Sequence, residues 1–143
     1  MGNNLVYRIT DDGNEQDIGE IYEMLKEYNL SNREQSENVP IGIFVENENN
    51  RKMAGLTGET FGNWLCIHYL FVAEHFRREG VGSKLLKAAE QEALRRGCKY
   101  AFVDTFSFQA PMFYEKHGYK EAFTLNDYPY TGKRYYYTKE LIP

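Results

Sequence analysis

Residues 64–83 read WLCIHYLFVAEHFRREGVGS and combine three local patterns. The first nine residues are rich in aromatic and branched side chains, which is typical of a strand buried on both faces. From Val81 onward apolar residues such as Leu85 and Ala89 recur three or four positions apart, and this spacing predicts an amphipathic helix. Gly97 is well placed to end that helix. The segment therefore predicts a strand, a loop and a helix in immediate succession.

The loop between this strand and this helix has features of an anion-binding turn. Gly80 and Gly82 let a ligand approach the backbone, and the N–H groups of the first helical turn have no helical acceptors. These groups and the helix dipole favour phosphate, while Arg77 and Arg78 add positive charge and fork-shaped donors. An ordinary glycine-bearing turn shares these features, and the spacing matches neither the P-loop nor the Gly-x-Gly-x-x-Gly pattern.

The composition indicates one folded domain over residues 1–143. Apolar residues make up 42% of the 143 residues. A chain of this length and composition can bury one hydrophobic core but is too short for two. The two cysteines, Cys66 and Cys98, have no metal-ligand or disulfide-framework spacing, so we expect buried thiols and no metal site. No segment has the length of a membrane span, and the N-terminal residues lack the basic region followed by an apolar region that is typical of a signal peptide. We expect a cytoplasmic protein that does not bind membranes.

Charge is unevenly distributed along the chain. Residues 1–63 hold 5 Lys and Arg against 12 Asp and Glu, whereas residues 64–143 hold 12 against 9. This balance disfavours a nucleic-acid binder, which usually has a basic surface. The split suits a polyanionic cofactor on one side and a cationic substrate on the other, although acidic residues that merely solvate the first helix would have the same effect.

The periodicity along the chain predicts an alternation of strands and helices. Residues 31–40 are polar and aperiodic, so we expect a loop there. The strand at 64–72, the following helix and the strand at 100–105 form a βαβ unit, which implies a parallel pair. The expected elements are strands at 5–10, 41–46, 52–60, 64–72, 100–105, 119–124 and 134–141, and helices at 15–30, from 81, and at 110–117.

Two motifs resemble those of the GNAT superfamily of acyl-CoA-dependent N-acyltransferases. Arg77-x-x-Gly80-x-Gly82 is similar to the family's pyrophosphate loop, and the segment from Ala110 through Phe113-Tyr114-Glu115-Lys116 to Gly118-Tyr119 is similar to its second motif. Ser107 departs from this pattern, because many members have Asn there. The resemblance implies an α/β fold with a mixed, mostly antiparallel central sheet of about six or seven strands and helices on both faces.

The resemblance also implies acetyl-CoA as cosubstrate. The pyrophosphate would lie on the N–H groups of residues 78–83, and the pantetheine arm would pair with the end of the central strand, which diverges from its neighbour near Val72. A backbone N–H there would also stabilise the thioester oxygen. The implied cofactor-binding residues are Leu70, Phe71, Val72, Arg77, Arg78, Glu79, Gly80, Val81, Gly82, Ser83, Phe113 and Lys116.

Acetyl transfer to an amine needs a group that removes a proton and a group that supplies one. Tyr114 matches the family's tyrosine and is the expected acid for the departing thiolate, although a packed core tyrosine is the alternative. Strand alternation places His68 on one face with Cys66, Leu70 and Val72. His68 is a candidate base, and Glu59 or a chain of water molecules is the alternative. We expect His75 and His117 to be exposed to solvent.

The predicted function is N-acetylation of a primary amine of a small molecule or peptide, by direct attack in a ternary complex. The alternative is a non-catalytic acyl-CoA-binding regulatory module. The sequence does not name the acceptor, which residues 31–40, the hairpin at 41–60 and residues 127–133 should select. The aromatic-rich strand at 134–141 either pairs across a homodimer or is an ordinary core strand.

Overall fold

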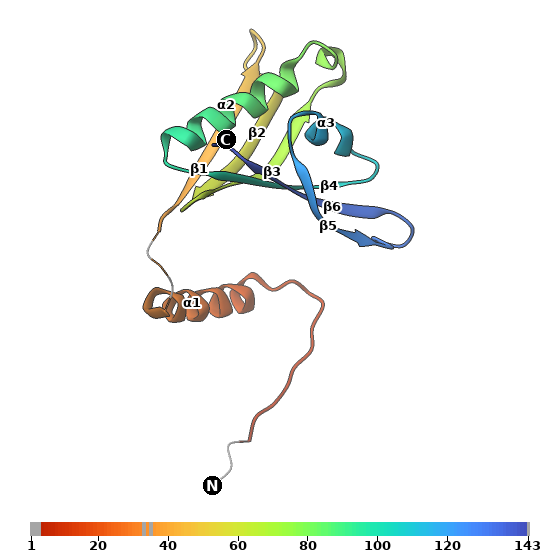
Figure 1. Ribbon diagram of the computed structural model, residues 1–143. Helices are drawn as coiled ribbons and strands as arrows, with labels where there is room; N and C mark the ends of the chain where they lie inside the picture. The colour runs from red at the N-terminus through yellow and green to blue at the C-terminus, as the bar shows by residue number, and fades with distance from the viewer. Residues whose placement is uncertain (1–3, 33, 35, 143) are drawn as a thin grey trace. The chain divides into compact units, whose positions relative to one another are not determined.

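A computed structural model of the chain describes residues 4–32, 34 and 36–142. The chain divides into two compact units, Met1–Gln35 and Ser36–Pro143. In the described residues the first unit holds helix α1, and the second holds six strands, helices α2 and α3 and the short 3-10 helix η1 (Figure 1). None of these helices is long and apolar enough to cross a bilayer.

Helix α1 (Glu15–Asn32) begins at a side-chain cap. The Oδ1 atom of Asn14 accepts the backbone N–H groups of Gln16 at 3.0 Å and of Asp17 at 3.1 Å. These bonds satisfy two of the N–H groups that a helix start leaves without acceptors. The predicted helix at 15–30 is confirmed, and it extends two residues further.

The predicted strand at residues 5–10 is wrong, because residues 4–11 have no regular secondary structure. Its apolar pattern is a local property, whereas a strand persists only where a neighbour takes up its backbone hydrogen bonds. The ladders of the described sheet begin at Asn38. The predicted loop at 31–40 is shortened from both ends by α1 and β1, and its residues 33 and 35 lie outside the described residues.

The second unit is built on a mixed sheet with the order β1-β2-β3-β4-β6-β5. The pair β3–β4 is parallel and the others are antiparallel, as expected for a sheet that contains one βαβ unit. The prediction of a mixed, mostly antiparallel sheet is confirmed. The elements are β1 (Asn38–Glu46), β2 (Lys52–Phe61), β3 (Trp64–Val72), η1 (Glu74–Phe76), α2 (Val81–Arg95), β4 (Tyr100–Phe106), α3 (Pro111–Lys116), β5 (Lys120–Asn126) and β6 (Lys133–Glu140).

The C-terminal strand β6 is an interior strand. It pairs with β4 on one side and with β5 on the other, so both of its backbone edges are occupied within the chain. Of the two alternatives for residues 134–141, pairing across a homodimer or an ordinary core strand, the pairing within the chain supports the core strand. Tyr137 of β6 is buried, and its hydroxyl donates to Glu115 Oε1 at 3.1 Å, which ties β6 to α3.

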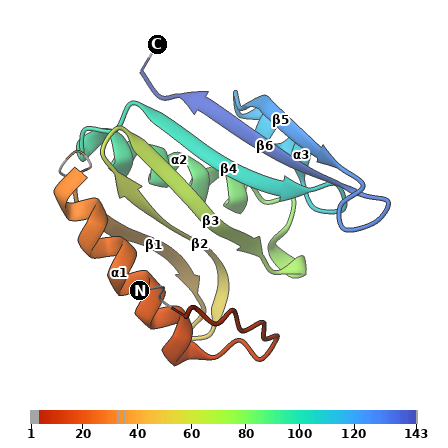
Figure 2. The same cartoon turned by 90° about the horizontal axis from the view of Figure 1, so that it is seen from below.

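Helices α2 and α3 lie on the same face of the sheet in both views (Figures 1 and 2). The core forms between this face and α2, which contributes Leu85, Leu86, Ala89 and Ala93. The buried residues of β4 are Ala101, Val103 and Thr105. Because successive strand residues point to opposite faces, Phe102, Asp104 and Phe106 belong to the other face. We call the sheet face that points away from α2 and α3 the far face.

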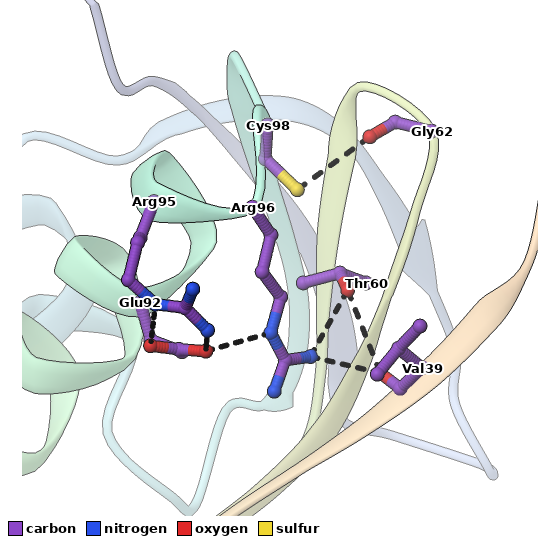
Figure 3. A network of polar contacts seen from close by, with 7 residues as sticks. All are labelled: Val39, Thr60, Gly62, Glu92, Arg95, Arg96 and Cys98. Carbon is purple, nitrogen blue, oxygen red and sulfur yellow. Dashed lines mark hydrogen bonds and ion pairs between the residues drawn. The ribbon is translucent and has the colours of Figure 1, made fainter.

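The end of α2 is attached to the first two strands by Arg96 (Figure 3). Its Nη1 atom donates to the backbone oxygen of Val39 and to Thr60 Oγ1, both at 3.1 Å. Its Nε atom donates to Glu92 Oε2 at 2.9 Å. This one side chain therefore links the helix to β1 and β2 through two hydrogen bonds, while the third holds it against Glu92 of α2.

Candidate functional site

A cavity of about 980 Å³ lies where the ends of β3 and β4 meet the loop before α2 and helix α3. Of the predicted site residues, Glu79 is exposed and does not line it. The others line it together: His68, Leu70, Phe71, Val72, Arg77, Arg78, Gly80, Val81, Gly82, Ser83, Phe113, Tyr114 and Lys116. Two motifs that are some thirty residues apart in the sequence thus form one site.

The cavity opens because β3 and β4 separate partway along their length. Their parallel ladder ends at the pair Cys66 and Phe102, and Figure 2 shows the two strands diverging beyond it. Between Ile67 and Val72, the N–H and C=O groups of β3 that do not pair with β2 are therefore left to face the gap. We expected this divergence near Val72, and the ladder ends six residues earlier.

A bulge in β3 at His68 changes which side chains share a face. In the β2–β3 ladder Thr57 pairs with Tyr69 and Gly58 with Ile67, so His68 is the extra residue. A Cβ atom at position 58 would collide with the carbonyl oxygen of Cys66, which explains a glycine opposite the bulge.

The predicted common face for His68, Cys66, Leu70 and Val72 is wrong for this reason. Leu70 and Val72 pack against the core that holds Leu65 and Ile67. His68 and Cys66 remain on the far face with Glu59, the ladder partner of Cys66. Strand β3 is also not buried on both faces within this unit, because Tyr69 is 76% exposed.

The loop before α2 presents a row of unpaired backbone donors. Within the described part of the chain, the N–H groups of residues 78–83 have no hydrogen-bond acceptor, and the first bond of the turn runs from Lys84 N–H to Gly80 O at 3.1 Å. Arg78 and Gly80 adopt φ values of 74° and 76°, in the left-handed region. Such alternation of conformation curls successive N–H groups around one point and makes an anion-binding concavity.

Arg77 is held against the strand end rather than free to swing. Its Nε atom donates to the carbonyl oxygen of Val72 at 3.0 Å, and its guanidinium lies 5.6 Å from the centre of the Phe71 ring. The positive charge therefore stays at the rim of the cavity, beside the row of unpaired N–H groups.

Tyr114 lies at the inner wall of the cavity. It is 6% exposed, its ring packs edge-on against Tyr119 at 5.7 Å, and no described residue hydrogen-bonds its hydroxyl. Burial, and secondly the negative charge of Asp104, raise the pKa of Tyr114 to about 12. If Tyr114 were only a packed core residue, its hydroxyl would be expected to donate to a carbonyl oxygen. No such hydrogen bond occurs among the described residues.

His68 and Glu59 form a pair on the far face. The distance from His68 Nε2 to Glu59 Oε1 is 3.8 Å, and both side chains are partly exposed. Cys66 lies next to them, and burial, followed by the charge of Glu59, raises the pKa of its thiol. The structure thus brings together the two side chains that the sequence left as alternatives for the base.

His117 attaches α3 to the first turn of α2, a role that the sequence did not reveal. Its Nε2 atom lies 2.7 Å from Ser83 Oγ, so the prediction that His117 is simply exposed is wrong; His75 is exposed as expected. A Cβ atom at Gly82 would lie 3.4 Å from the Phe113 ring. The glycine therefore lets α3 pack closely on the start of α2.

The segment between β4 and α3 is fixed by side chains that the motif comparison did not identify. Gln109 Oε1 accepts the Phe106 N–H at 2.7 Å and lies 3.2 Å from Thr105 Oγ1. Ser107, at the departure from the family pattern, accepts the Lys133 N–H at 3.2 Å through its hydroxyl and does not line the cavity. Asp104 does line the cavity. It belongs to neither motif, and its relevance becomes visible only through its ion pair with Arg134 across the sheet.

No group of three or more His, Cys, Asp or Glu side chains that could hold a metal ion occurs among the described residues. Free Cys98 is buried and free Cys66 partly buried, so the expectation of buried thiols is met fully for Cys98 alone.

Comparison with known proteins identifies the family. Residues 40–121 match the family model described as an acetyltransferase (GNAT) domain. An acetyltransferase of Agrobacterium fabrum is 37% identical over 105 residues, which cover 73% of this chain and 77% of that protein. The blasticidin-S acetyltransferase of Streptomyces morookaense is 41% identical over 76 residues, 52% of this chain and 56% of that protein.

Solved structures show the same fold. The crystal structure of an acetyltransferase from Bacillus cereus superposes with a TM-score of 0.82 at 32% identity, and covers 93% of this chain and 97% of that one. An aminoglycoside 6'-N-acetyltransferase complexed with coenzyme A has a TM-score of 0.65 at 18% identity, over 91% of this chain and 82% of that one. The chain belongs to the GNAT family and is an acetyltransferase.

Proposed function

We propose that this acetyltransferase moves the acetyl group of acetyl-CoA to a primary amine of a small molecule, by direct attack in a ternary complex. The carrying observation is the gap between β3 and β4, which has unpaired backbone donors at one end and the unbonded Tyr114 hydroxyl on its inner wall. The His68–Glu59 pair lies on the far face. Donor and acceptor can thus meet in the gap from opposite sides of the sheet.

Acetyl-CoA fits the residues on the helix side of the gap. The N–H groups of residues 78–83 would hold the pyrophosphate, with Arg77 and Lys116 adding charge at the rim. The polar groups of β3 that face the gap would pair with the pantetheine amides as an added strand does. When bound, the thioester supplies the acetyl group. A β3 N–H facing the gap is suited to stabilising negative charge on its oxygen.

Tyr114 is the proposed acid for the departing thiolate. A phenol with a pKa of about 12 stays protonated at neutral pH, and a hydroxyl without an internal partner is free to point at the sulfur. A free thiol has a pKa of about 8.5, so full proton transfer from this phenol to a free thiolate is uphill. The phenol therefore has to hold its O–H close to the sulfur and donate the proton as the C–S bond breaks. Buried packing against Tyr119 and Tyr137 supplies that positioning.

His68 is the proposed base, with Glu59 orienting it. An alkylamine has a pKa of about 10 and is mostly protonated at neutral pH, so it must lose a proton before it attacks. His68 lines the cavity on the side away from the phosphate loop. A carboxylate 3.8 Å from its ring is close enough to bias its orientation. The alternatives are that Glu59 removes the proton directly or that water carries it away. Comparing the single variants H68A and E59Q distinguishes them.

The names of relatives support a small-molecule acceptor. One relative is named for blasticidin S and one structural neighbour for N-acetylation of an aminoglycoside. The excess of acidic residues in the first half of the chain suits an acceptor that carries a positively charged amino group.

The proposal is tested by measuring acetyl-CoA binding and the release of free thiol over a panel of primary amines. We expect saturable binding by calorimetry and amine-dependent release of CoA. Saturable acetyl-CoA binding without thiol release from any amine would support the non-catalytic module instead. Absence of acetyl-CoA binding would overturn the assignment of the loop.

A further inference from the structure

A carboxylate on the far face has one oxygen that no described residue uses. Asp104 of β4 is gripped by Arg134 of β6, whose Nε and Nη2 atoms both lie 2.8 Å from the same oxygen, Oδ2. The Oδ1 atom accepts no hydrogen bond from any described residue. The side chain is 26% exposed, and the residue lines the cavity. The free oxygen thus belongs to a group that is held in place yet remains accessible.

Arg134 is immobilised by aromatic rings, which keeps Asp104 in one orientation. Its guanidinium lies 5.4 Å from the centres of the Phe106 and Tyr128 rings and 5.2 Å from that of Tyr136. Its Nη1 atom donates to the Tyr128 hydroxyl at 3.0 Å. Stacking and hydrogen bonding of this kind fix the planar guanidinium, so the carboxylate is pre-organised rather than mobile.

The position of Asp104 relates it to the reaction site. Cys66 and Phe102 form the last pair of the β3–β4 ladder, and Asp104 and His68 each follow two residues later, on the two sides of the gap. Both line the cavity, and both point to the far face. An amine that approaches the gap from this face would meet His68 on one wall and Asp104 on the other.

Aromatic side chains continue the Asp104 wall toward solvent. Phe108 stacks on Phe106 with ring centres 5.4 Å apart, lines the cavity and is 81% exposed. Tyr69, on the β3 side, lines the same cavity. A wall that combines one carboxylate oxygen with flat apolar rings fits a cation attached to an apolar body.

We propose that Asp104 binds the amino group of the acceptor, with its Oδ1 atom accepting an N–H of the ammonium and then of the neutral amine, and that the acceptor is a primary amine on an aromatic or apolar body. This inference rests on the proposed amine acetylation and adds the residue and the class of acceptor. The bond turns the amine toward the gap, where His68 faces it.

The alternative is that the ion pair between Asp104 and Arg134 only stabilises the contact of β4 with β6 and binds no acceptor. In that case replacing Asp104 lowers stability, and amines lose no more affinity than neutral molecules of the same shape. The two interpretations therefore differ in the discrimination between charged and neutral ligands, which is independent of stability and of turnover.

The test compares 2-phenylethylamine with 2-phenylethanol, which has the same shape without the charge. Affinities are measured by calorimetry at pH 7.5 with saturating CoA, so that no acetyl transfer occurs. The variants are D104N, the double variant D104N/R134Q, which leaves no unpaired guanidinium, and E140Q as a control. Glu140 is exposed and lies at the other end of β6, so E140Q removes a negative charge away from the cavity.

We expect the unaltered protein and E140Q to bind the amine at least about tenfold more tightly than the alcohol, the usual effect of one charge-assisted hydrogen bond. D104N and the double variant should lose this preference. Should D104N fail to fold, the double variant still decides. A preference that survives in the variants, or its absence from the unaltered protein, would overturn the proposal.

Failure of the proposed function has a different signature. In that event the amine binds with its preference intact, but acetyl-CoA in place of CoA yields no free thiol with this or any other amine. Discrimination that depends on Asp104 together with thiol release supports both inferences.

Discussion

Replacing Tyr114 by Phe should separate catalysis from folding more cleanly than any other substitution in this chain. The hydroxyl has no hydrogen-bond partner among the described residues, while the ring packs against Tyr119 and Tyr137. Tyr114→Phe keeps the ring and removes an oxygen that contributes no internal bond. We therefore expect the free energy of unfolding to change by less than about 0.5 kcal/mol.

The catalytic effect should be large by contrast. Loss of a positioned proton donor typically lowers kcat by about 10²–10⁴-fold. The KM and the dissociation constant for acetyl-CoA should change less than about threefold, because the phosphate loop and β3 are untouched. Steady-state thiol release and calorimetry give the two quantities.

Tyr119→Phe is the matched control, with the opposite expectation. The Tyr119 hydroxyl donates to Glu90 Oε2 at 2.8 Å, next to the ion pair of Glu90 and Lys139 at 2.9 Å. Its removal should cost about 1–3 kcal/mol of stability in chemical denaturation, with kcat within about twofold of the unaltered enzyme.

The pH dependence adds an independent check on Tyr114. Because its pKa is raised to about 12, the phenol should stay protonated up to about pH 10, and kcat should not fall on the alkaline side below that pH. Equal kcat values for Tyr114→Phe and the unaltered enzyme would refute the assignment. So would a kcat loss that Tyr119→Phe reproduces.

Four further predictions concern the loop and the end of α2. Gly82→Trp should raise the dissociation constant of acetyl-CoA at least tenfold by calorimetry, since even a Cβ there would lie 3.4 Å from the neighbouring ring; unchanged affinity would mean that the loop is misassigned. Gly80→Ala should lower stability by about 1–2 kcal/mol in urea, because its φ of 76° disfavours any side chain; an unchanged midpoint would contradict this. Arg96→Ala should lower stability by about 1–3 kcal/mol through its lost bonds to Val39 and Thr60. Hydrogen bonds from Arg95 and Arg96 lower the pKa of Glu92 to about 2. The stability lost in Glu92→Gln should therefore be full above about pH 4.5 and vanish as the pH falls toward 2, and a loss that persists at pH 2 would refute this linkage.

The elements that depend on local interactions were predictable. Strand β3 and the start of α2 occur at the expected residues, because a continuous apolar run, a glycine turn and a 3.6-residue period are readable within one short segment. The unpaired N–H groups of residues 78–83 were predictable for the same reason, since they follow from where a helix begins. The strand at residues 5–10 was not, because its existence depends on a distant partner.

The arrangement of side chains around the gap required the tertiary structure. The bulge at His68 reverses the alternation of β3, and it arises from the pairing with Gly58 rather than from any local pattern. The contact between His117 and Ser83 joins residues 34 positions apart, and that between Arg134 and Asp104 joins residues 30 positions apart. Neither pair has a spacing signal.

The sequence by itself determined the family and the positions of the candidate loop and the candidate acid, because each is carried by a contiguous motif. Tertiary structure alone decided which face His68 occupies, what holds α3 to the loop and which oxygen of Asp104 is free. The physical reason is that strand pairing and side-chain packing join distant residues, so faces and free atoms are defined only once the sheet has formed.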